Sequence, residues 1–207
     1  MSDRTLASYI DSVASATPAP GAGSVAAIAG AMGCALGEMV CRITAGGSET
    51  GPSHPLEASL RVLAACREQL LLLSPADEEA YLAFRTAQAM PKSTVSEKGE
   101  RTAAMQQSLL VAAEVPLQIA SESARALGAL ESVAKLGSRY TLADIATAAH
   151  LLTAAINGAL ANVEVNVRMI RDADRKSQLS LSIAALREKR SKLLASVLAV
   201  IEDRSLA

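Results

Sequence analysis

Apolar residues recur every three or four positions along most of the chain, and this spacing is typical of amphipathic helices. In the first such segment, residues 3–14, the apolar positions are Leu6, Ile10 and Val13. Later segments with helical spacing cover residues 24–44, 56–89, 97–135, 141–170 and 174–202. No segment alternates apolar and polar residues in the manner of a strand. The pattern predicts an all-α fold, an antiparallel bundle of long, partly kinked helices in one domain over residues 1–207.

Prolines and glycines mark where these helices are expected to end or bend. The run TPAPGAG at residues 17–23 stops the first helix, because a proline inside a helix removes a backbone hydrogen bond. Residues 46–55 and 91–100 are predicted to be polar loops. Ser74-Pro75-Ala76-Asp77 has the features of a new helix start, so the third segment is expected to kink or restart there. Pro116 predicts another kink.

The segment at 24–44 is unusually rich in small residues. Gly30, Gly33 and Gly37 all lie inside it, although each glycine in a helix interior costs about 1 kcal/mol relative to alanine. Close approach of neighbouring helices would explain them, so we expect this helix at the centre of the bundle. Two charge-free stretches, 12–37 and 145–163, lack the leucine and isoleucine density and the flanks of a membrane span. We therefore expect both to be enclosed by protein on nearly all sides.

Composition narrows the classes of fold and partner. Half of the residues are hydrophobic but only 2% are aromatic, and the chain has 42 Ala and 27 Leu. Alanine and leucine favour helices over strands, which argues against an all-β fold. The formal net charge of −1 and the scarcity of aromatic side chains argue against binding to nucleic acid. We expect neither a nucleic-acid nor a membrane partner.

The cysteines and the amino-terminal residues indicate in which cellular compartment the protein is expected. Cys34, Cys41 and Cys66 form no C-x-x-C pair and are odd in number, which favours buried thiols over a disulfide framework or a zinc site. The first residues, MSDRTLASYIDS, have no signal-peptide organisation. The expectation is a cytoplasmic protein without a metal site.

Several short motifs, in order, resemble those of the formiminotetrahydrofolate cyclodeaminase / methenyltetrahydrofolate cyclohydrolase family. The resemblance covers nearly the whole chain. It is carried by the motif TPAPGAGS at 17–24, Asp77-x-x-Ala80-Tyr81, Met90-Pro91-Lys92 with Glu97-Lys98 and Arg101, Val115-Pro116-Leu117, the stretch from Gly137 to Asp144, and Asn162-Val163-x-x-Asn166.

The resemblance implies an all-helical homodimer with a folate bound in a cleft between subunits. Family members expel ammonia from formiminotetrahydrofolate or hydrolyse methenyltetrahydrofolate to the formyl compound. Both reactions pass through a cationic carbon that an ionised carboxylate stabilises. The tetrahydrofolate derivative is the substrate, and no tightly bound cofactor is expected. Because the chain has no transferase half, the expectation leans toward the hydrolase.

The resemblance also assigns candidate site residues. Asp144, Asp77 and Lys92 are the predicted catalytic residues, and Lys92 and Arg101 could hold the glutamate carboxylates of the folate tail. The predicted substrate-binding residues are Pro20, Gly21, Gly23, Ser24, Tyr81, Arg101, Tyr140, Asn162 and Asn166. We expect at least one of Tyr81 and Tyr140 to border the cleft, where a flat pterin could stack.

Each candidate also has a purely structural interpretation. Ser74-x-x-Asp77 and Thr141-x-x-Asp144 both match a helix capping box. Asn162 and Asn166, one helical turn apart, could read pterin edges or bond across helices. The glycines could form a plain interhelical turn, and the basic residues could lie in a solvated loop.

This sequence departs from the family pattern at several polar positions. Ala22 replaces the middle glycine of the triple, residues 46–49 replace a lysine-bearing stretch, and Ser138 and Ala143 replace an asparagine and a serine. Two alternatives therefore stay open. One is a relative that acts on a different amidine or imine, and the other is a non-catalytic helical dimer whose aspartates only cap helices.

Overall fold

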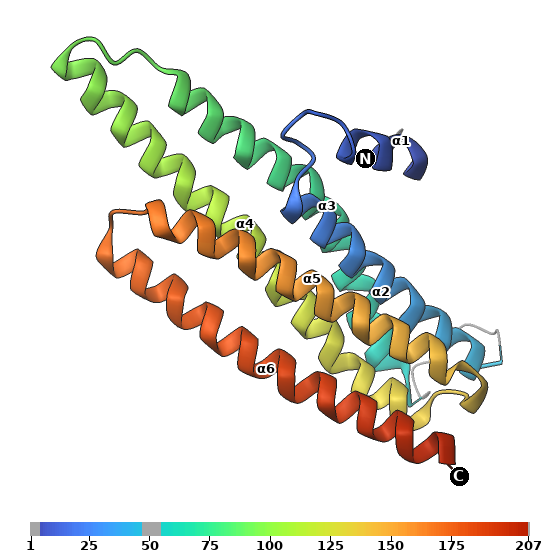
Figure 1. Ribbon diagram of the computed structural model, residues 1–207. Helices are drawn as coiled ribbons and strands as arrows, with labels where there is room; N and C mark the ends of the chain where they lie inside the picture. Colours follow the sequence, from blue (N-terminus) through green and yellow to red (C-terminus); the bar gives the residue numbers. More distant parts are fainter. Residues whose placement is uncertain (1–4, 47–54, 207) are drawn as a thin grey trace.

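The computed structural model describes residues 5–46 and 55–206, and in these residues it contains helices and no strand. The elements, shown in Figure 1, are α1 (Leu6–Val13), α2 (Ala22–Thr44), α3 (Glu57–Ala89), α4 (Val95–Leu136), the 3₁₀ turn η1 (Arg139–Thr141), α5 (Leu142–Met169) and α6 (Ala173–Leu206). The all-α prediction is confirmed. The expected loop at 46–55 lies mostly outside the described residues.

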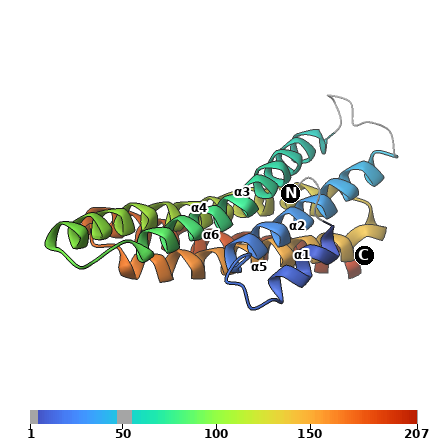
Figure 2. The ribbon, with the colours of Figure 1, turned by 90° about the horizontal axis from the view of Figure 1, so that it is seen from above.

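The long helices run up and down, each antiparallel to the one before it (Figures 1 and 2). α2 packs against α3 and α5, α4 packs against the same two helices, and α6 covers α4 and α5. The turn between α3 and α4 projects beyond the turn between α5 and α6. This arrangement brings the start of α2, the middle of α3 and the end of α5 together.

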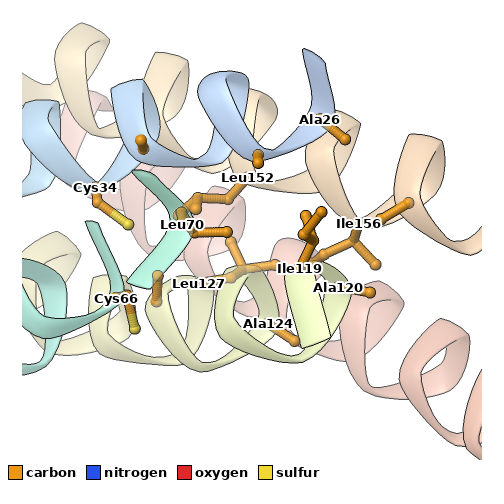
Figure 3. Packing of buried hydrophobic residues seen from close by; sticks show 14 of the residues in the cluster. Ala26, Cys34, Cys66, Leu70, Ile119, Ala120, Ala124, Leu127, Leu152 and Ile156 are labelled. Atoms are coloured by element: carbon orange, nitrogen blue, oxygen red, sulfur yellow. The ribbon is translucent and has the colours of Figure 1, made fainter. Parts of the chain in front are cut away.

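Leucine and isoleucine side chains fill the space between the four central helices. Figure 3 shows Leu70 of α3, Ile119 and Leu127 of α4, and Leu152 and Ile156 of α5 converging below α2. None of the five side chains has measurable exposure to solvent. At roughly 25 cal/mol per Å² of buried apolar area, such side chains supply most of the driving force for folding.

The glycines of α2 allow its neighbours to approach its backbone, as the small-residue pattern predicts. A Cβ atom built on Gly33 would lie 2.9 Å from the Cγ of Leu152 and 3.0 Å from the carbonyl oxygen of Ala148. Both atoms belong to α5, and one of them is backbone, so they cannot simply move aside. The close packing of α2 on α5 therefore requires a residue without a side chain here.

The prediction that α2 is enclosed on nearly all sides is wrong for one face. Val25, Met32 and Ile43 are 39%, 49% and 49% exposed. By length and composition α2 could cross a membrane, but 61% of its most apolar window is buried inside the bundle. Its apolar character thus comes from two sources, the core side and an apolar outer face.

Helix α1 also differs from its prediction. Leu6, Ile10 and Val13, which the spacing placed on the apolar face, are exposed, and Tyr9 is the buried residue of this helix. An eight-residue helix has too little surface to bury a full stripe, and the Tyr9 hydroxyl has a polar partner in the interior.

The predictions for Pro75, Pro116 and the start of α4 were incomplete. α3 and α4 each continue as one helix through Pro75 and Pro116, so of the two alternatives expected at Ser74, a kink or a restart, the restart does not occur. α4 begins within the expected polar loop, because the Thr94 side chain and Glu97 form a reciprocal capping box.

The cysteines are free and buried, as predicted. Burial raises the pKa of all three thiols. The pKa of Cys41 is raised to about 11 and that of Cys66 to about 12, and that of Cys34 is raised as well. Near them Glu38 is almost fully buried, and it accepts hydrogen bonds from Arg67 at 2.6 Å and Arg42 at 3.0 Å. The pair with Arg67 joins α2 to α3.

Replacing Gly33 by alanine is expected to destabilise the protein. Overpacking a tight interface costs about 1–3 kcal/mol, which exceeds the gain of about 1 kcal/mol in helix propensity. Gly99→Ala is the matched control, because a Cβ there meets nothing within 4 Å, and it should raise stability. Chemical denaturation measures both variants, and equal shifts of the free energy of unfolding would contradict this account of α2.

Candidate functional site

A cleft of about 300 Å³ opens where the loop before α2 meets α3, α4 and α5. Its walls combine two carboxylates, two amides, two aromatic rings and several small or apolar groups. They are Pro18, Ala19, Gly21, Ala22, Asp77, Glu78, Tyr81, Phe84, Ala112, Asn162, Val165, Asn166 and Met169. A space of this size with few polar groups is typical of a small-molecule site.

Asp77 is the polar centre of the cleft. Its carboxylate is buried, with 8% of the residue exposed, and it accepts hydrogen bonds at both oxygens. The backbone N–H of Ser24 donates to Oδ2 at 3.0 Å, and Nδ2 of Asn162 donates to Oδ1 at 3.3 Å. The N-cap of α2, Gly21, offers no side-chain hydrogen bond. Asp77, from α3, therefore caps a different helix, at the end where the dipole favours an anion.

Gly23 makes this cap possible. A Cβ atom built on Gly23 would lie 2.0 Å from Oδ1 of Asp77 and 2.4 Å from its Cγ. No side chain fits in that space while the carboxylate keeps its place. A glycine at this position is required by the approach of Asp77 to the start of α2.

The two asparagines of α5 extend the hydrogen-bonded chain across the cleft. Nδ2 of Asn166 donates to the carbonyl oxygen of Ala112 at 2.7 Å, and to Oδ1 of Asn162 at 3.4 Å. Asn162 in turn donates to Asp77. Both asparagines bond across helices, and both also line the cleft.

The environment of Asp77 raises the pKa of its carboxyl. Burial raises the pKa of the Asp77 carboxyl above its usual value, the nearby charge of Glu78 raises this pKa further, and the hydrogen bond from Ser24 opposes both. A carboxyl with a raised pKa holds a proton closer to neutral pH, as a general acid or base must.

The remaining walls suit a flat, positively charged ligand. Tyr81 and Phe84 present aromatic rings from successive turns of α3, and Val165 and Met169 are apolar residues of α5. The residues that line the cleft include two carboxylates and no lysine or arginine. A cation with a planar body would bind between acidic and aromatic groups.

The structure brings many of the predicted site residues together. Gly21, Asp77, Tyr81, Asn162 and Asn166 line the cleft. Directly beneath it lie Ser24, which bonds to Asp77, and Gly23, which contacts Asp77, and the adjacent Pro20 is buried. Of the two tyrosines expected near a ligand, Tyr81 lines this cleft, which does not include Asp144.

Four other predicted residues lie outside this cleft. Asp144 is in the first turn of α5, eighteen positions before Asn162, which corresponds to about 27 Å along a helix. Tyr140 is 89% exposed near the same end. Lys92 is exposed in the turn between α3 and α4, and Arg101, near the start of α4, donates to the carbonyl oxygen of Gln88 at 3.0 Å. Within one chain, Asp77 and Asp144 do not share a pocket.

Neither predicted capping box forms. Ser74 lies inside the continuous α3, and its hydroxyl is 2.8 Å from that of Ser24. The Thr141 hydroxyl donates to the carbonyl oxygen of Ser138 at 2.8 Å and does not cap α5.

Several lining residues were absent from the predicted set. Glu78 follows Asp77 directly, and its charge could have been noticed for that reason. Phe84 lies one turn beyond Tyr81. Ala112 and Met169 carry no chemical signal in the sequence, because a backbone carbonyl and a thioether contribute here only through their position.

Comparison with known proteins places this chain in one family. The family described as Formiminotransferase-cyclodeaminase matches residues 5–185. A formimidoyltransferase-cyclodeaminase of Sus scrofa is 35% identical over 97% of the chain, and a similar relative from Gallus gallus is 33% identical. The chain spans only 37% of the length of either relative.

Two further relatives are similar in length to this chain. A methenyltetrahydrofolate cyclohydrolase of Methylorubrum extorquens is 33% identical over 82% of each sequence. The crystal structure of a formiminotetrahydrofolate cyclodeaminase from Thermotoga maritima superposes with a TM-score of 0.84, at 25% identity, over 98% of both chains.

The raised pKa of Asp77 predicts how the stability of the protein depends on pH. The unfolded chain loses this proton near the usual pKa of 3.8, and the folded protein loses it at higher pH. Between these two values the folded state binds more protons, so the Asp77 contribution to stability falls as pH rises. In Asp77→Asn this contribution disappears. As pH rises from the unfolded pKa to the folded pKa, the free energy of unfolding of the variant should therefore increase relative to that of wild type. Denaturation at several pH values from 4 to 7 gives the free energy of unfolding of Asp77→Asn minus that of wild type. If this difference falls as pH rises, the raised pKa of Asp77 is refuted.

Proposed function

The chain belongs to the formiminotransferase-cyclodeaminase family, and from this premise we propose that it is a folate one-carbon enzyme whose active site is the Asp77 cleft. Its reaction is hydrolysis of methenyltetrahydrofolate to formyltetrahydrofolate, or cyclisation of formiminotetrahydrofolate with release of ammonia. The observation that carries the proposal is the buried Asp77 carboxylate, held by Ser24 and Asn162 in an acidic, aromatic cleft. Three of the motifs that resemble the family lie at this cleft, namely TPAPGAGS at 17–24, Asp77-x-x-Ala80-Tyr81 and Asn162-Val163-x-x-Asn166. The relatives of the chain include proteins named for both reactions.

The cleft suits the intermediate that both reactions share. The methenyl bridge is a carbon between two nitrogens, and the three atoms together carry one positive charge. Asp77 and Glu78 place negative charge in the cleft, where a low local dielectric strengthens the attraction. Tyr81 offers a ring on which the pterin can stack, and Asn162 offers an amide for its polar edge.

In the cyclisation, N10 of the substrate attacks the formimino carbon at N5 and its proton passes to the imine nitrogen. The resulting amine leaves as ammonia after it takes one further proton. An Asp77 carboxyl with a raised pKa is suited to donate that proton. The bond to ammonia breaks, and the methenyl cation remains.

In the hydrolysis, water attacks the methenyl carbon and gives one proton to a base. The bond from this carbon to N5 then breaks, N5 takes the second proton of the water, and the formyl group remains on N10. Asp77 in its ionised form is suited to be the base. The two reactions therefore use opposite protonation states of one group.

Neither reaction transfers electrons, so the proposal includes no tightly bound cofactor. Proton transfer and charge stabilisation are sufficient, and the residues around Asp77 provide both. The three free, buried thiols are consistent with a reducing compartment. On that basis we propose a cytoplasmic location.

We propose that the folate tail runs along α3 toward the turn between α3 and α4. From Asp77 to the end of α3 at Ala89 is twelve residues, or about 18 Å of helix. Lys92 lies just beyond this end and is exposed. Its ammonium, with the nearby Arg101, can meet the glutamate carboxylates, for which the cleft itself has no basic side chain.

We propose that the enzyme is a homodimer joined through the outer face of α2. From Ala22 to Met39 the side chains on this face are all apolar, and Val25 and Met32 are its most exposed large members. An uncharged strip over five helical turns is typical of a surface that a partner covers. Leu6 and Ile10 of α1 add apolar surface near the amino end of α2.

An antiparallel pairing of the two α2 helices connects this interface with Asp144. A twofold axis near Met32 brings the carboxyl end of one α2 beside the amino end of the other. Within one chain, the carboxyl end lies next to the turn before α5, because the N–H of Ser138 donates to the Thr44 hydroxyl at 2.9 Å. We propose that this end of one subunit, with Tyr140 and Asp144, faces the cleft of the other.

Asp77→Asn should abolish most of the activity. The amide keeps the shape of the side chain but can neither donate nor accept the proton, and loss of general acid–base catalysis lowers kcat by about 10²–10⁴-fold. The measurements are the loss of the methenyl chromophore and the release of ammonia from formiminotetrahydrofolate. Glu79→Gln, an exposed position on the same helix, is the control. Full activity of Asp77→Asn, or a wild-type protein inactive in both assays, would refute the proposal.

Met32→Glu should convert the dimer to a monomer. A carboxylate in an apolar interface is left without a partner, and two such charges meet across the twofold axis. Analytical ultracentrifugation gives the mass in solution. Leu181→Glu, on the outer face of α6 and 69% exposed, should leave the mass unchanged. A wild-type monomer, or a Met32→Glu dimer, would argue against the α2 interface.

A further inference from the structure

Among the described side chains of helix α1, Tyr9 is the one that is buried in the bundle. Leu6 and Ile10 are 57% and 56% exposed, whereas Tyr9 is 3% exposed. The helix lies beside the amino-terminal part of α2 (Figures 1 and 2). The loop that follows it supplies Pro18 and Ala19 to the wall of the cleft. Tyr9 thus anchors a segment that continues directly into the site.

The Tyr9 hydroxyl reaches Ser24, which lies at the centre of a buried cluster of polar groups. Oγ of Ser24 is 2.9 Å from the Tyr9 hydroxyl and 2.8 Å from Oγ of Ser74, and it donates to Oε1 of Glu78 at 3.1 Å. A serine hydroxyl has one proton and two lone pairs. Because its proton goes to Glu78, the Tyr9 and Ser74 hydroxyls donate to its lone pairs. The hydroxyl of Ser24 is therefore saturated, and its three partners come from two other helices, α1 and α3.

Ser24 also contacts the proposed catalytic carboxylate. Its backbone N–H donates to Oδ2 of Asp77, while its side chain holds Glu78. Both acidic residues of the cleft are therefore bonded to the same residue, one through the backbone and the other through the side chain. The charge of Glu78 acts on Asp77 in turn, since it raises the pKa of that carboxyl.

We propose that Tyr9 is a positioning residue, which acts through Ser24 to hold the Asp77–Glu78 pair in its working geometry. This inference rests on the function proposed above and adds a residue outside the cleft to its machinery. Tyr9 does not line the cleft, so its effect on the reaction passes through Ser24. Helix α1 thus contributes to the site through the buried Tyr9 hydroxyl, which fixes the orientation of Ser24.

Loss of the Tyr9 hydroxyl has a specific expected effect. Ser24 loses one of its two donors, and its side chain gains freedom to turn away from Glu78. Tyr81, Phe84 and Asn162, which contact the proposed substrate, keep their places in the wall of the cleft. Substrate binding is therefore retained, and the rate of the proton transfer falls.

The test is the variant Tyr9→Phe, which keeps the ring and removes only the hydroxyl. We expect kcat to fall about 10- to 100-fold, with KM changed little. Ser8→Ala is the matched control on the same helix, because within the described part of the chain the exposed Ser8 hydroxyl bonds to the neighbouring Thr5 carbonyl alone, and its kinetics should equal those of wild type. A Tyr9→Phe enzyme with the kcat of wild type would overturn the proposal.

A double variant separates positioning from a general loss of structure. If Tyr9 acts through Ser24, then Tyr9→Phe combined with Ser24→Ala should be no slower than Ser24→Ala alone. Two losses that multiply would show that Tyr9 acts by another route, and would contradict the proposal. Melting curves of each variant identify any rate loss that comes from unfolding.

Hydrogen exchange at the Ser24 amide provides a readout that does not depend on turnover. In Tyr9→Phe this amide should exchange faster than in wild type, because Ser24 is held less firmly against Asp77, and Ser8→Ala should show no change. A wild-type protein inactive on both folates would refute the proposed function alone. Unchanged exchange in Tyr9→Phe would refute the link from Tyr9 to Ser24 whether or not the protein is active.

Discussion

The fold and the site both depend on the contact between the Asp77 carboxylate and the backbone at the start of α2. Gly23 leaves the space for this contact, and the N–H of Ser24 makes the hydrogen bond. The contact replaces the cap that α2 lacks, joins α2 to α3, and places a carboxylate at the bottom of a cleft. Asn162 adds α5 to the same group. Three helices are thus positioned around one buried acid.

This arrangement combines a structural role with reactivity. A carboxylate that served only as a cap would be most favourable where hydrogen bonds and helix dipole lower its pKa. Here burial and Glu78 outweigh the bond from Ser24, and the pKa of Asp77 is raised. Burying an amide at this position would cost less free energy than burying a carboxyl group. The protein nevertheless has a carboxyl group here, which is expected where a proton must be transferred. The capping and catalytic interpretations of Asp77 are therefore compatible.

The helical bundle and most of the cleft's polar and aromatic residues could be predicted from the sequence. The other features depend on tertiary contacts. Helical spacing and the glycines of α2 predicted the bundle and its close packing, because both follow from local periodicity and side-chain size. The family motifs indicated Asp77, Tyr81, Asn162 and Asn166, which do meet in one cleft. Local signals at Ser74-Pro75 left a kink and a restart both open, and the structure excludes the restart, because α3 stays helical through Pro75. The role of Tyr9 was missed because its partner, Ser24, is fifteen positions away, and no local pattern marks such a pair.

The most direct test of the central claim is a crystal structure of the protein with a stable analogue of methenyltetrahydrofolate. The account predicts the bridging carbon next to the Asp77 carboxylate, the pterin against Tyr81 and Asn162, and the tail directed along α3 toward Lys92. A pterin bound away from Asp77, at any other place on the protein, would contradict it.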